Sequence, residues 1–392
     1  MKAGWKKEPL GALCDFQRGL TYAKSDEVDI SDNIVLRATN IDLISNLLDV
    51  TELKYISDKV VVPNSKKVKK DSLIICTASG SKSHLGKVAY IDDDYGFAFG
   101  GFMGMITPKK GLLSKYLFHL MTSNAYKDFI AKLSDGANIN NLKFDDLRKF
   151  TVPYPKQDEQ QRIVGILDEA FEGIATAKAN AEKNLQNARA LFESHLQSVF
   201  TKKNKDWIDK PLGEVCEYLN GKAHEQCIDK DGRFIVINSK FISSDGAVFK
   251  RSNEALLLLQ PDDIAMVLSD VPNGRALAKC FLVEEANKYT LNQRICLIRS
   301  NKFHTKFLFY QLNRNKHFLA FNNGENQTNM RLNQILSCPL FLPPISEQKD
   351  IAARIDFMKE ETQRLESIYQ SKLAALEALK KSLLHQAFTG AL

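Results

Sequence analysis

The stretch WKKEPLGALCDFQRG at residues 5–19 recurs as WIDKPLGEVCEYLNG at residues 207–221. A constant offset of 202 aligns the two stretches, with six identities in fifteen positions. A repeat this long does not form a solenoid, whose units span roughly 20 to 50 residues. The sequence therefore predicts two homologous domains in one chain.

A second set of repeated positions closes each copy, now with an offset of 188. The matched residues are Gly136, Asn138, Asn141, Glu159, Gln160 and Ile163 with Gly324, Asn326, Asn329, Glu347, Gln348 and Ile351, and the register continues to Phe200-Thr201 and Phe388-Thr389. The change of offset means that the second copy lacks 14 residues between the matched ends. A catalytic repeat would keep its reactive residues in both copies. A repeated frame around divergent inserts instead favours one scaffold that presents two different recognition surfaces.

Each insert has the pattern of an α/β domain. Short apolar runs rich in β-branched residues, separated by Gly, Asn and Asp, predict strands. These runs are 33–36, 73–76 and 87–91 in the first insert and 234–237, 264–268 and 294–298 in the second. A single helix is expected to close each insert, near residues 114–133 and 305–321.

A long helix is predicted after each insert. Proline pairs at 153 and 155 and at 343 and 344 end the preceding strand, and apolar residues then recur mostly three or four positions apart. This spacing is typical of a coiled-coil seam. Each helix would run about 40 residues, or roughly 60 Å. Packing of each helix on its own domain is the alternative, but two equivalent helices in one chain most simply pair with each other, antiparallel.

The predicted fold is therefore α+β: two α/β domains separated by a long antiparallel two-helix coiled coil, with a pseudo-two-fold internal repeat. The predicted bounds are 1–152 and 202–342 for the two domains and 153–201 and 343–392 for the two spacer helices.

Composition limits the class of protein. The net charge of +7 favours a polyanionic partner, although 47 acidic residues offset 54 basic ones. Seven scattered cysteines without a C-x-x-C pair are typical of a reducing compartment. No apolar run approaches the roughly 20 residues of a membrane helix, so a cytoplasmic protein is expected.

The ordered motifs carry a family resemblance over nearly the whole chain. The Trp-x3-Pro-Leu-Gly segments at 5–11 and 207–213, the Pro-x3-Glu-Gln helix start at 155–160 with its shorter variant at 344–348, and the two Phe-Thr helix ends resemble the specificity subunit of type I restriction-modification systems. The resemblance implies two target-recognition domains, each reading one half of a bipartite asymmetric site in double-stranded DNA. It also implies binding to two methyltransferase subunits, which use S-adenosylmethionine, and to restriction subunits. No cofactor of its own is implied. The variant helix start in the second copy leaves the symmetry of the methyltransferase contacts open.

The residues argue against an enzyme. The segment Leu342-Pro343-Pro344-Ile345 lacks the amide and the aromatic of an adenine methyltransferase motif. A phosphate-binding G-x-x-x-x-G-K-[ST] loop and an H-E-x-x-H metal motif are both missing, and the seven histidines have no ligand spacing. The glycine-rich segment 100–104 lies in an apolar stretch and is not repeated in the second copy, which disfavours a cofactor loop. A coiled-coil scaffold or a stand-alone DNA-binding protein remains the alternative function.

Candidate DNA-binding residues are polar side chains on loops that follow the predicted strands, because Arg, Lys, Asn and Gln read base edges and Ser, Lys and Arg bind phosphates. In the first copy they are Arg37, Thr39, Asn40, Ser81, Lys82, His84, Lys87, Asn138 and Asn140. In the second copy they are Asn238, Lys240, Asn273, Arg275, Asn292, Gln293, Arg294, Asn326 and Arg331. For any one of them, a turn or surface role is the alternative.

Overall fold

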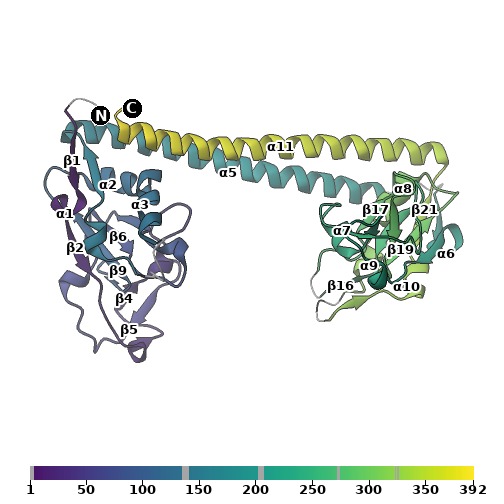
Figure 1. Cartoon of the computed structure of the whole chain (residues 1–392), viewed down its shortest axis with the longest axis horizontal. Helices are drawn as coiled ribbons and strands as arrows, with labels where there is room; N and C mark the ends of the chain where they lie inside the picture. Colours follow the sequence, from purple (N-terminus) through teal and green to yellow (C-terminus); the bar gives the residue numbers. More distant parts are fainter. Residues whose placement is uncertain (1–3, 135–140, 202–206, 272–273, 323, 325) are drawn as a thin grey trace. The chain divides into compact units, whose positions relative to one another are not determined.

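A computed structural model describes residues 4–134, 141–201, 207–271, 274–322, 324 and 326–392. The chain forms two compact units. The first contains residues 1–183 and 369–392, and the second contains residues 184–368. Each long helix therefore contributes residues to both units (Figure 1).

The first unit is built on two four-stranded sheets. One is antiparallel, in the order β2-β9-β6-β7, and the other has the order β3-β5-β4-β8, with β4 and β8 parallel. Their bounds are β2 Cys14–Arg18, β9 Met103–Pro108, β6 Ser72–Cys76, β7 Val88–Ile91, β3 Glu27–Val28, β5 Lys54–Ile56, β4 Asn33–Leu36 and β8 Ala98–Phe99. A separate pair, β1 (Lys6–Pro9) with β10 (Thr151–Tyr154), joins the two ends of the domain.

The second unit repeats this plan. Its antiparallel sheet has the order β12-β19-β15-β17, its second sheet has the order β14-β13-β18 with β13 and β18 parallel, and β11 pairs with β21. The bounds are β12 Glu217–Asn220, β19 Ile295–Arg299, β15 Ile264–Val267, β17 Cys280–Leu282, β14 Lys250–Ser252, β13 Phe234–Ile237, β18 Tyr289–Leu291, β11 Ile208–Pro211 and β21 Pro339–Leu342. An additional pair, β16 (Ser269–Asp270) with β20 (Thr328–Asn329), corresponds to an isolated bridge between Ala78 and Asn141 in the first unit.

Short helices complete each unit. In the first they are α1 Leu10–Leu13, α2 Ser114–Thr122, α3 Asn124–Ser134 and α4 Phe144–Leu147, with 3-10 turns η1 Lys24–Asp26, η2 Ala38–Asn40, η3 Asn64–Lys66 and η4 Lys82–His84. In the second they are α6 Leu212–Val215, α7 Ser239–Ser243, α8 Thr305–Leu312, α9 Lys316–Leu319 and α10 Leu332–Leu336, with η5 Glu225–Cys227.

The expectation of a single closing helix in each insert is wrong. Extended backbone at Ser123 separates α2 from α3. In the second unit, Arg314 adopts a left-handed conformation with φ of 57°, and the Asn315 side chain then caps a new helix. Both positions interrupt a continuous apolar pattern, so local backbone chemistry determines the break.

The two long helices are confirmed as continuous elements of 45 residues each, α5 Gln157–Thr201 and α11 Ile345–Thr389. Within the first unit, Lys178 of α5 forms an ion pair with Glu377 of α11 at 3.2 Å. Within the second unit, Arg189 of α5 forms one with Glu366 of α11 at 2.7 Å. In the first unit, Arg162 of α5 also donates to the carbonyl of Leu392, just after α11. Residue numbers thus rise along α5 as they fall along α11, so the helices pair antiparallel there.

The predicted seam is only partly closed. Ile163, Leu167 and Ala181 of α5 are buried, as expected for a seam. On α11, however, Leu365 and Leu379 keep 40% and 48% of their surface exposed. A two-helix pair encloses less of each side chain than a bundle does, which leaves these positions accessible.

The repeated Glu-Gln motif fixes the start of each long helix. The buried Gln160 accepts a hydrogen bond from the Leu113 amide and donates to the carbonyls of Gly111 and Pro155. Gln348 does the same in the second unit, accepting from the His304 amide and donating to the Pro343 carbonyl. The repeated glutamine thus joins each helix to the loop before α2 or α8.

An aspartate in the N-terminal part of each long helix makes a second contact that is repeated in the two units, this time with helix α2 or α8. Asp168 of α5 binds His119 and Lys115 of α2, both within 2.9 Å. The hydrogen bond to His119 is the main reason that the pKa of Asp168 falls to about 2. At the equivalent position, Asp356 of α11 binds Lys306 and Tyr310 of α8.

The repeated cysteines Cys14 and Cys216 have a structural environment. Cys14 is buried and Cys216 is half-buried, and all seven cysteines are free thiols. Burial raises the pKa of Cys14 and of Cys216 to about 12. A thiol with such a pKa is a poor nucleophile and a poor metal ligand.

The glycines that end the repeated opening segment allow a close backbone contact. A Cβ atom on Gly19 would lie 1.9 Å from the carbonyl oxygen of Gly100, and one on Gly221 would lie 2.0 Å from that of Asn292. These distances are far below van der Waals contact, so any side chain would push the two segments apart.

We expect Gly19→Ala and Gly221→Ala each to lower the free energy of unfolding by about 2 kcal/mol or more, because the backbone must shift to admit the methyl group. Chemical denaturation followed by circular dichroism measures the change. Gly173→Ala in α5 is the matched control, since a Cβ there meets nothing within 4 Å. Alanine in an exposed helix is expected to stabilise by roughly 0.5–1 kcal/mol. Equal effects at all three glycines would contradict the steric account.

Candidate nucleic-acid interface

One turn lies at the same place in both units and is held by the same backbone contacts. It joins β8 to β9 at residues 100–102 and β18 to β19 at residues 292–294. In the first unit, the Gly100 amide donates to the Leu36 carbonyl and the Leu20 amide donates to the Phe99 carbonyl. In the second unit, the Asn292 amide donates to Ile237 and the Lys222 amide donates to Leu291.

The other side of the turn is fixed in the same way. The amides of Thr77 and Gly19 donate to the carbonyls of Phe102 and Met103 in the first unit. Their counterparts are the amides of Leu268 and Gly221, which donate to the carbonyls of Arg294 and Ile295. The backbone of the turn is therefore common to both units, whereas its side chains are Gly-Gly-Phe in one and Asn-Gln-Arg in the other.

A groove of about 580 Å³ lies beside this turn in the first unit. The groove is lined by residues from the segments after three strands and by the turn residue Phe102. Tyr22 follows β2, Arg37 and Thr39 follow β4, and Ser79 follows β6. Two cations, Arg37 and Lys24, are exposed at its edge, and Phe102 keeps 73% of its surface exposed. Hydrogen-bonding groups, positive charge and an apolar ring thus meet on one surface, the combination that reads nucleic acid.

The equivalent groove of the second unit has a different lining. It encloses about 230 Å³ between His224, Asn238, Lys250 and the turn residue Asn292. His224 stands at the position of Tyr22, under the same offset of 202 as the repeated opening segment. Asn238 directly follows β13 as Arg37 directly follows β4, so these two residues are also equivalent, with an offset of 201. His224 is buried and is held by the Lys222 carbonyl and the Thr290 hydroxyl, so it forms part of the groove floor.

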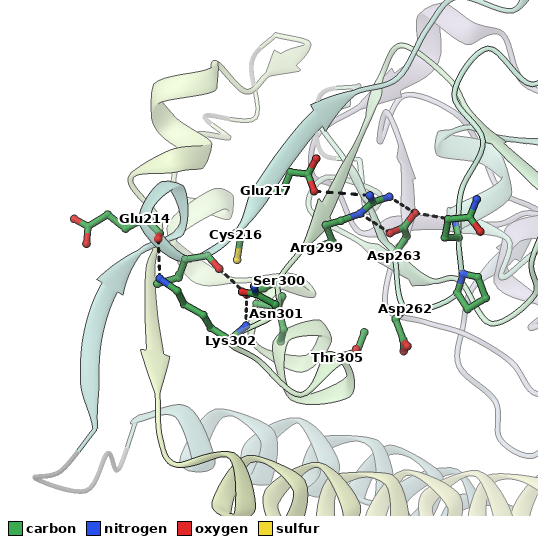
Figure 2. A pocket seen from close by; sticks show the side chains of 14 residues that line it. Glu214, Cys216, Glu217, Asp262, Asp263, Arg299, Ser300, Asn301, Lys302 and Thr305 are labelled. Atoms are coloured by element: carbon green, nitrogen blue, oxygen red, sulfur yellow. Dashed lines mark hydrogen bonds and ion pairs between the residues drawn. The ribbon is translucent and has the colours of Figure 1, made fainter.

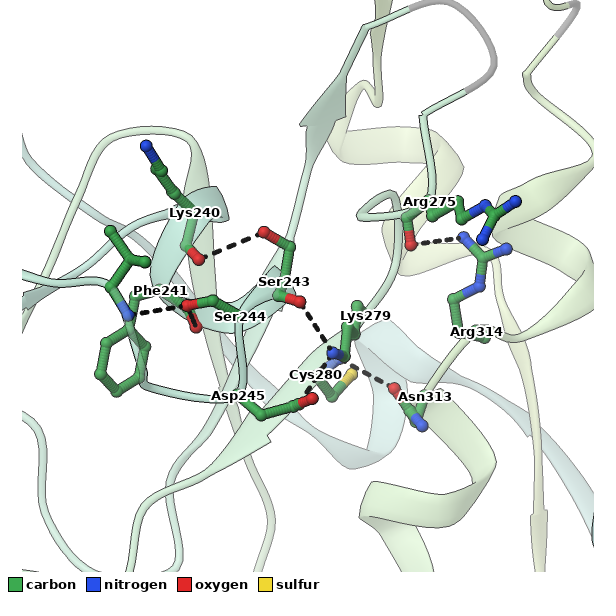
Figure 3. Close-up of polar contacts among 11 residues, drawn as sticks. Lys240, Phe241, Ser243, Ser244, Asp245, Arg275, Lys279, Cys280, Asn313 and Arg314 are labelled. Atoms are coloured by element: carbon green, nitrogen blue, oxygen red, sulfur yellow. Dashed lines mark hydrogen bonds and ion pairs between the residues drawn. The ribbon is translucent and has the colours of Figure 1, made fainter. Parts of the chain in front are cut away.

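A basic loop follows β16 in the second unit. Asp270 of β16 accepts hydrogen bonds from the amides of Ala276 and Leu277, which folds the loop that carries Arg275. The Arg275 carbonyl in turn accepts a hydrogen bond from the Arg314 guanidinium (Figure 3). Lys279 is bound by Asp245, whereas the exposed side chains of Lys240 and Arg275 have no hydrogen bond or ion pair among the residues that the structure describes.

Comparison with known proteins identifies the family of this chain. The model for the type I restriction modification DNA specificity domain matches residues 2–186 and 204–371. The chain belongs to this family. It is 28% identical to the StySPI specificity subunit of Salmonella potsdam and 26% identical to the EcoKI specificity subunit of Escherichia coli K12, in each case over 99% of this chain and 89% of the relative.

Solved structures share the fold of this specificity subunit. A chain from a structural study of complex assembly and conformational transition in a type I R-M system has a TM-score of 0.83 at 17% identity, covering 100% of this chain and 99% of that one. The HsdS subunit of Thermoanaerobacter tengcongensis has a TM-score of 0.64 at 17% identity, covering 100% and 98%. The resemblance stated from the sequence is thereby confirmed, as is the predicted fold. The relatives are named as specificity subunits, which supports the expectation that the chain is not itself catalytic.

Several predicted DNA-binding residues of the specificity subunit lie on the surfaces described above. Arg37 and Thr39 line the first groove, Asn238 and Asn292 line the second, and the exposed Gln293 and Arg294 complete its turn. Asn326 and Arg331 are exposed and flank β20, which pairs with β16 and so lies beside the Arg275 loop. Ser81 is exposed in the loop after β6, and the backbone of Lys82 lies in η4.

Two predicted residues have structural contacts that argue against a DNA contact. Asn40 is only 2% exposed; its side-chain oxygen accepts a hydrogen bond from the Arg37 amide, and its side-chain nitrogen donates to the carbonyls of Asp49 and Glu52. The Lys87 ammonium donates to the Ile41 carbonyl at 2.6 Å, and desolvation lowers its pKa. We therefore exclude Asn40 and Lys87 from the proposed surface. His84 is half-buried, and its buried Nδ1 atom has no hydrogen-bond partner among the residues that the structure describes, so His84 stays a prediction.

Three further predictions, Asn138, Asn140 and Asn273, lie outside the described residues. Asn238 also has a structural role, because its side-chain oxygen accepts a hydrogen bond from the Phe241 amide and so caps helix α7. Asn238 also lines the groove of the second unit.

Sequence reasoning missed Phe102, Tyr22 and His224. The sequence pattern around Phe102 disfavours a cofactor loop and does not by itself indicate a DNA contact. Tyr22 and His224 could have been found by extending the offset of 202 three residues beyond the repeated glycines.

A larger polar pocket of about 700 Å³ lies at the other end of β19 from the turn (Figure 2). The buried carboxylate of Asp263 binds both Nε and Nη2 of Arg299 at 2.9 Å and raises the pKa of Arg299. Ser300 donates to the Val215 carbonyl and Lys302 to the Glu214 carbonyl. These contacts join β19 to α6, so the pocket belongs to the repeated frame and not to the reading surface.

The structure supplies no sign of a metal site or membrane segment in the residues it describes. No group of three or more His, Cys, Asp or Glu side chains is arranged to hold a metal ion there. Within the same residues, no helix combines the length and the apolar character needed to cross a bilayer.

Proposed function

We propose that this specificity subunit reads a bipartite, asymmetric target in double-stranded DNA, one half-site through each groove. The observation that carries the proposal is the duplicated turn, in which equivalent backbone hydrogen bonds present different side chains in the two units. Major-groove readout depends on such side chains, since each base pair offers a distinct pattern of donors, acceptors and methyl groups there.

The chain acts as the non-catalytic part of a larger complex. Two methyltransferase subunits, which use S-adenosylmethionine, and restriction subunits assemble on it, and the repeated frame offers two equivalent sets of surfaces for two equal partners. The long helices, which both units share, set the gap between the half-sites. The free thiols of the specificity subunit, and the absence of a membrane-spanning helix in the described residues, suit action in the cytoplasm.

Methylome sequencing of cells that carry this chain with its companion subunits tests the proposal. We expect one methylated motif with two specified segments, of different sequence, separated by unspecified bases. Calorimetry of the isolated chain should detect no binding of S-adenosylmethionine. A complex that assembles but never methylates or binds DNA would instead favour the scaffold alternative.

A further inference from the structure

Phe102 and Arg294 occupy the same position of the duplicated turn. Phe102 directly precedes the first residue of β9, and Arg294 directly precedes the first residue of β19. The carbonyl of each accepts an amide from the strand-end segment alongside, Thr77 in the first unit and Leu268 in the second. The side chains of Phe102 and Arg294 are therefore attached at equivalent backbone positions in the two units.

The turn is rigid, which makes it suitable for a base contact. Besides the contacts to neighbouring segments, the amide of the following residue closes the turn on Gly100 at 2.8 Å and on Asn292 at 3.0 Å. Gly19 and Gly221 permit the close approach that locks it, as described above. A side chain on such a turn loses little backbone freedom when it binds, so more of its contact energy contributes to discrimination.

Neither side chain has a structural role in the part of the chain that the structure describes. Phe102 is 73% exposed, although phenylalanine is among the most often buried residues. The Arg294 guanidinium is exposed and makes no hydrogen bond or ion pair among the described residues. The Arg294 backbone, by contrast, is fixed by the Asn292 side chain and the Leu268 amide.

We propose that this turn is the principal specificity-determining element of each half-site, with Arg294 reading a guanine and Phe102 contacting a thymine methyl group. Arginine binds guanine O6 and N7 with two parallel hydrogen bonds, and apolar side chains such as phenylalanine pack on the thymine C5 methyl. The inference rests on the proposed function and adds to it the residues and the base type that each one selects.

Substitutions at the two positions, tested in the full complex by methylome sequencing, should alter different halves of the motif. Arg294→Ala should reduce the preference for one guanine by roughly 5- to 150-fold, the range of one bidentate contact. Arg294→Gln should shift that position towards adenine, because glutamine pairs with adenine N6 and N7. Phe102→Ser should relax one thymine in the other half-site, and every remaining specified base should stay unchanged.

Matched controls precede β4 and β13, at the opposite end of these two strands from Arg37 and Asn238. Ile30 is 82% exposed and precedes β4, and Arg233 is exposed and precedes β13. Ile30→Ser and Arg233→Ala should leave the motif unchanged. Circular dichroism melting of each variant tests folding, which these exposed positions should not perturb.

The outcomes separate this inference from the proposed function. A bipartite motif from the native complex that persists, base for base, in all Phe102 and Arg294 variants would overturn the inference and leave the proposed function intact. A uniform fall in methylation without a change of motif would also overturn it, since it would assign the turn to phosphate binding. Absence of any bipartite motif from the native complex would overturn both.

Discussion

Inserting three heptads into each long helix, after Lys183 in α5 and after Ile368 in α11, is expected to lengthen the gap between the half-sites and to leave both half-sites unchanged. Twenty-one helical residues add about 32 Å at 1.5 Å per residue. This length corresponds to about nine base pairs at 3.4 Å each. Because it is close to one DNA turn of 10–10.5 base pairs, each reader should still meet its half-site on nearly the same side of the duplex.

Shorter insertions provide graded controls. One heptad in each helix adds about 10 Å, or roughly three base pairs, which also turn one half-site by about 100° around the DNA axis. We expect this variant to methylate a motif with a longer gap but more weakly than the three-heptad variant. Two extra residues in α11 alone rotate its apolar stripe by about 200° and should abolish activity, since the seam with α5 is lost.

The measurement is again the methylated motif, read with all companion subunits present. Active heptad variants that keep the original gap would contradict the account and would assign the spacing to the methyltransferase subunits.

Replacing residues 13–150 by the equivalent segment of a related specificity subunit is expected to change one half of the motif completely and to leave the other half intact. The segment contains the whole first groove and its turn, whereas the groove of the second unit lies entirely within residues 222–294. Gln160 and Asp168 of α5 lie outside the exchanged segment, but their partners Leu113 and His119 lie inside it, so the replacement segment must supply equivalent partners.

The reciprocal exchange of residues 215–338 is the matched control. It should replace the other half-site and preserve the first. Simultaneous change of both half-sites in either chimera would exclude two independent readers. The melting profile of each chimera shows whether a loss of activity comes from misfolding, because the long helices bind the exchanged segments through Gln160 and Gln348.

The frame of this fold could be predicted from the sequence because repetition exposes it. Gly19 with Gly221, and Gln160 with Gln348, are repeated since each pair makes the same contact in its unit. The long helices could be predicted equally well, because an apolar spacing of three or four residues continues through both.

The reading surface could be predicted only in part, because divergence removes the signal that repetition provides. Arg37 was found from its place after a strand, but so was Asn40, whose burial depends on the carbonyls of Asp49 and Glu52 many positions away. Phe102 was missed because an exposed aromatic cannot be told from a core residue without the contacts of its turn. The breaks at Ser123 and Arg314 are likewise local backbone conformations within patterns that favour continuous helices.

Site-specific cross-linking tests the two-reader account most directly. A photoreactive amino acid would be placed at Thr39, which lines the first groove, or separately at Lys240, two residues after the groove residue Asn238. Both positions lie on the exposed segment after β4 or β13. With the full complex bound to its target, cross-links from Thr39 are expected only in one half-site and those from Lys240 only in the other. Cross-links from both positions to the same half-site, or to the unspecified gap alone, would contradict the account.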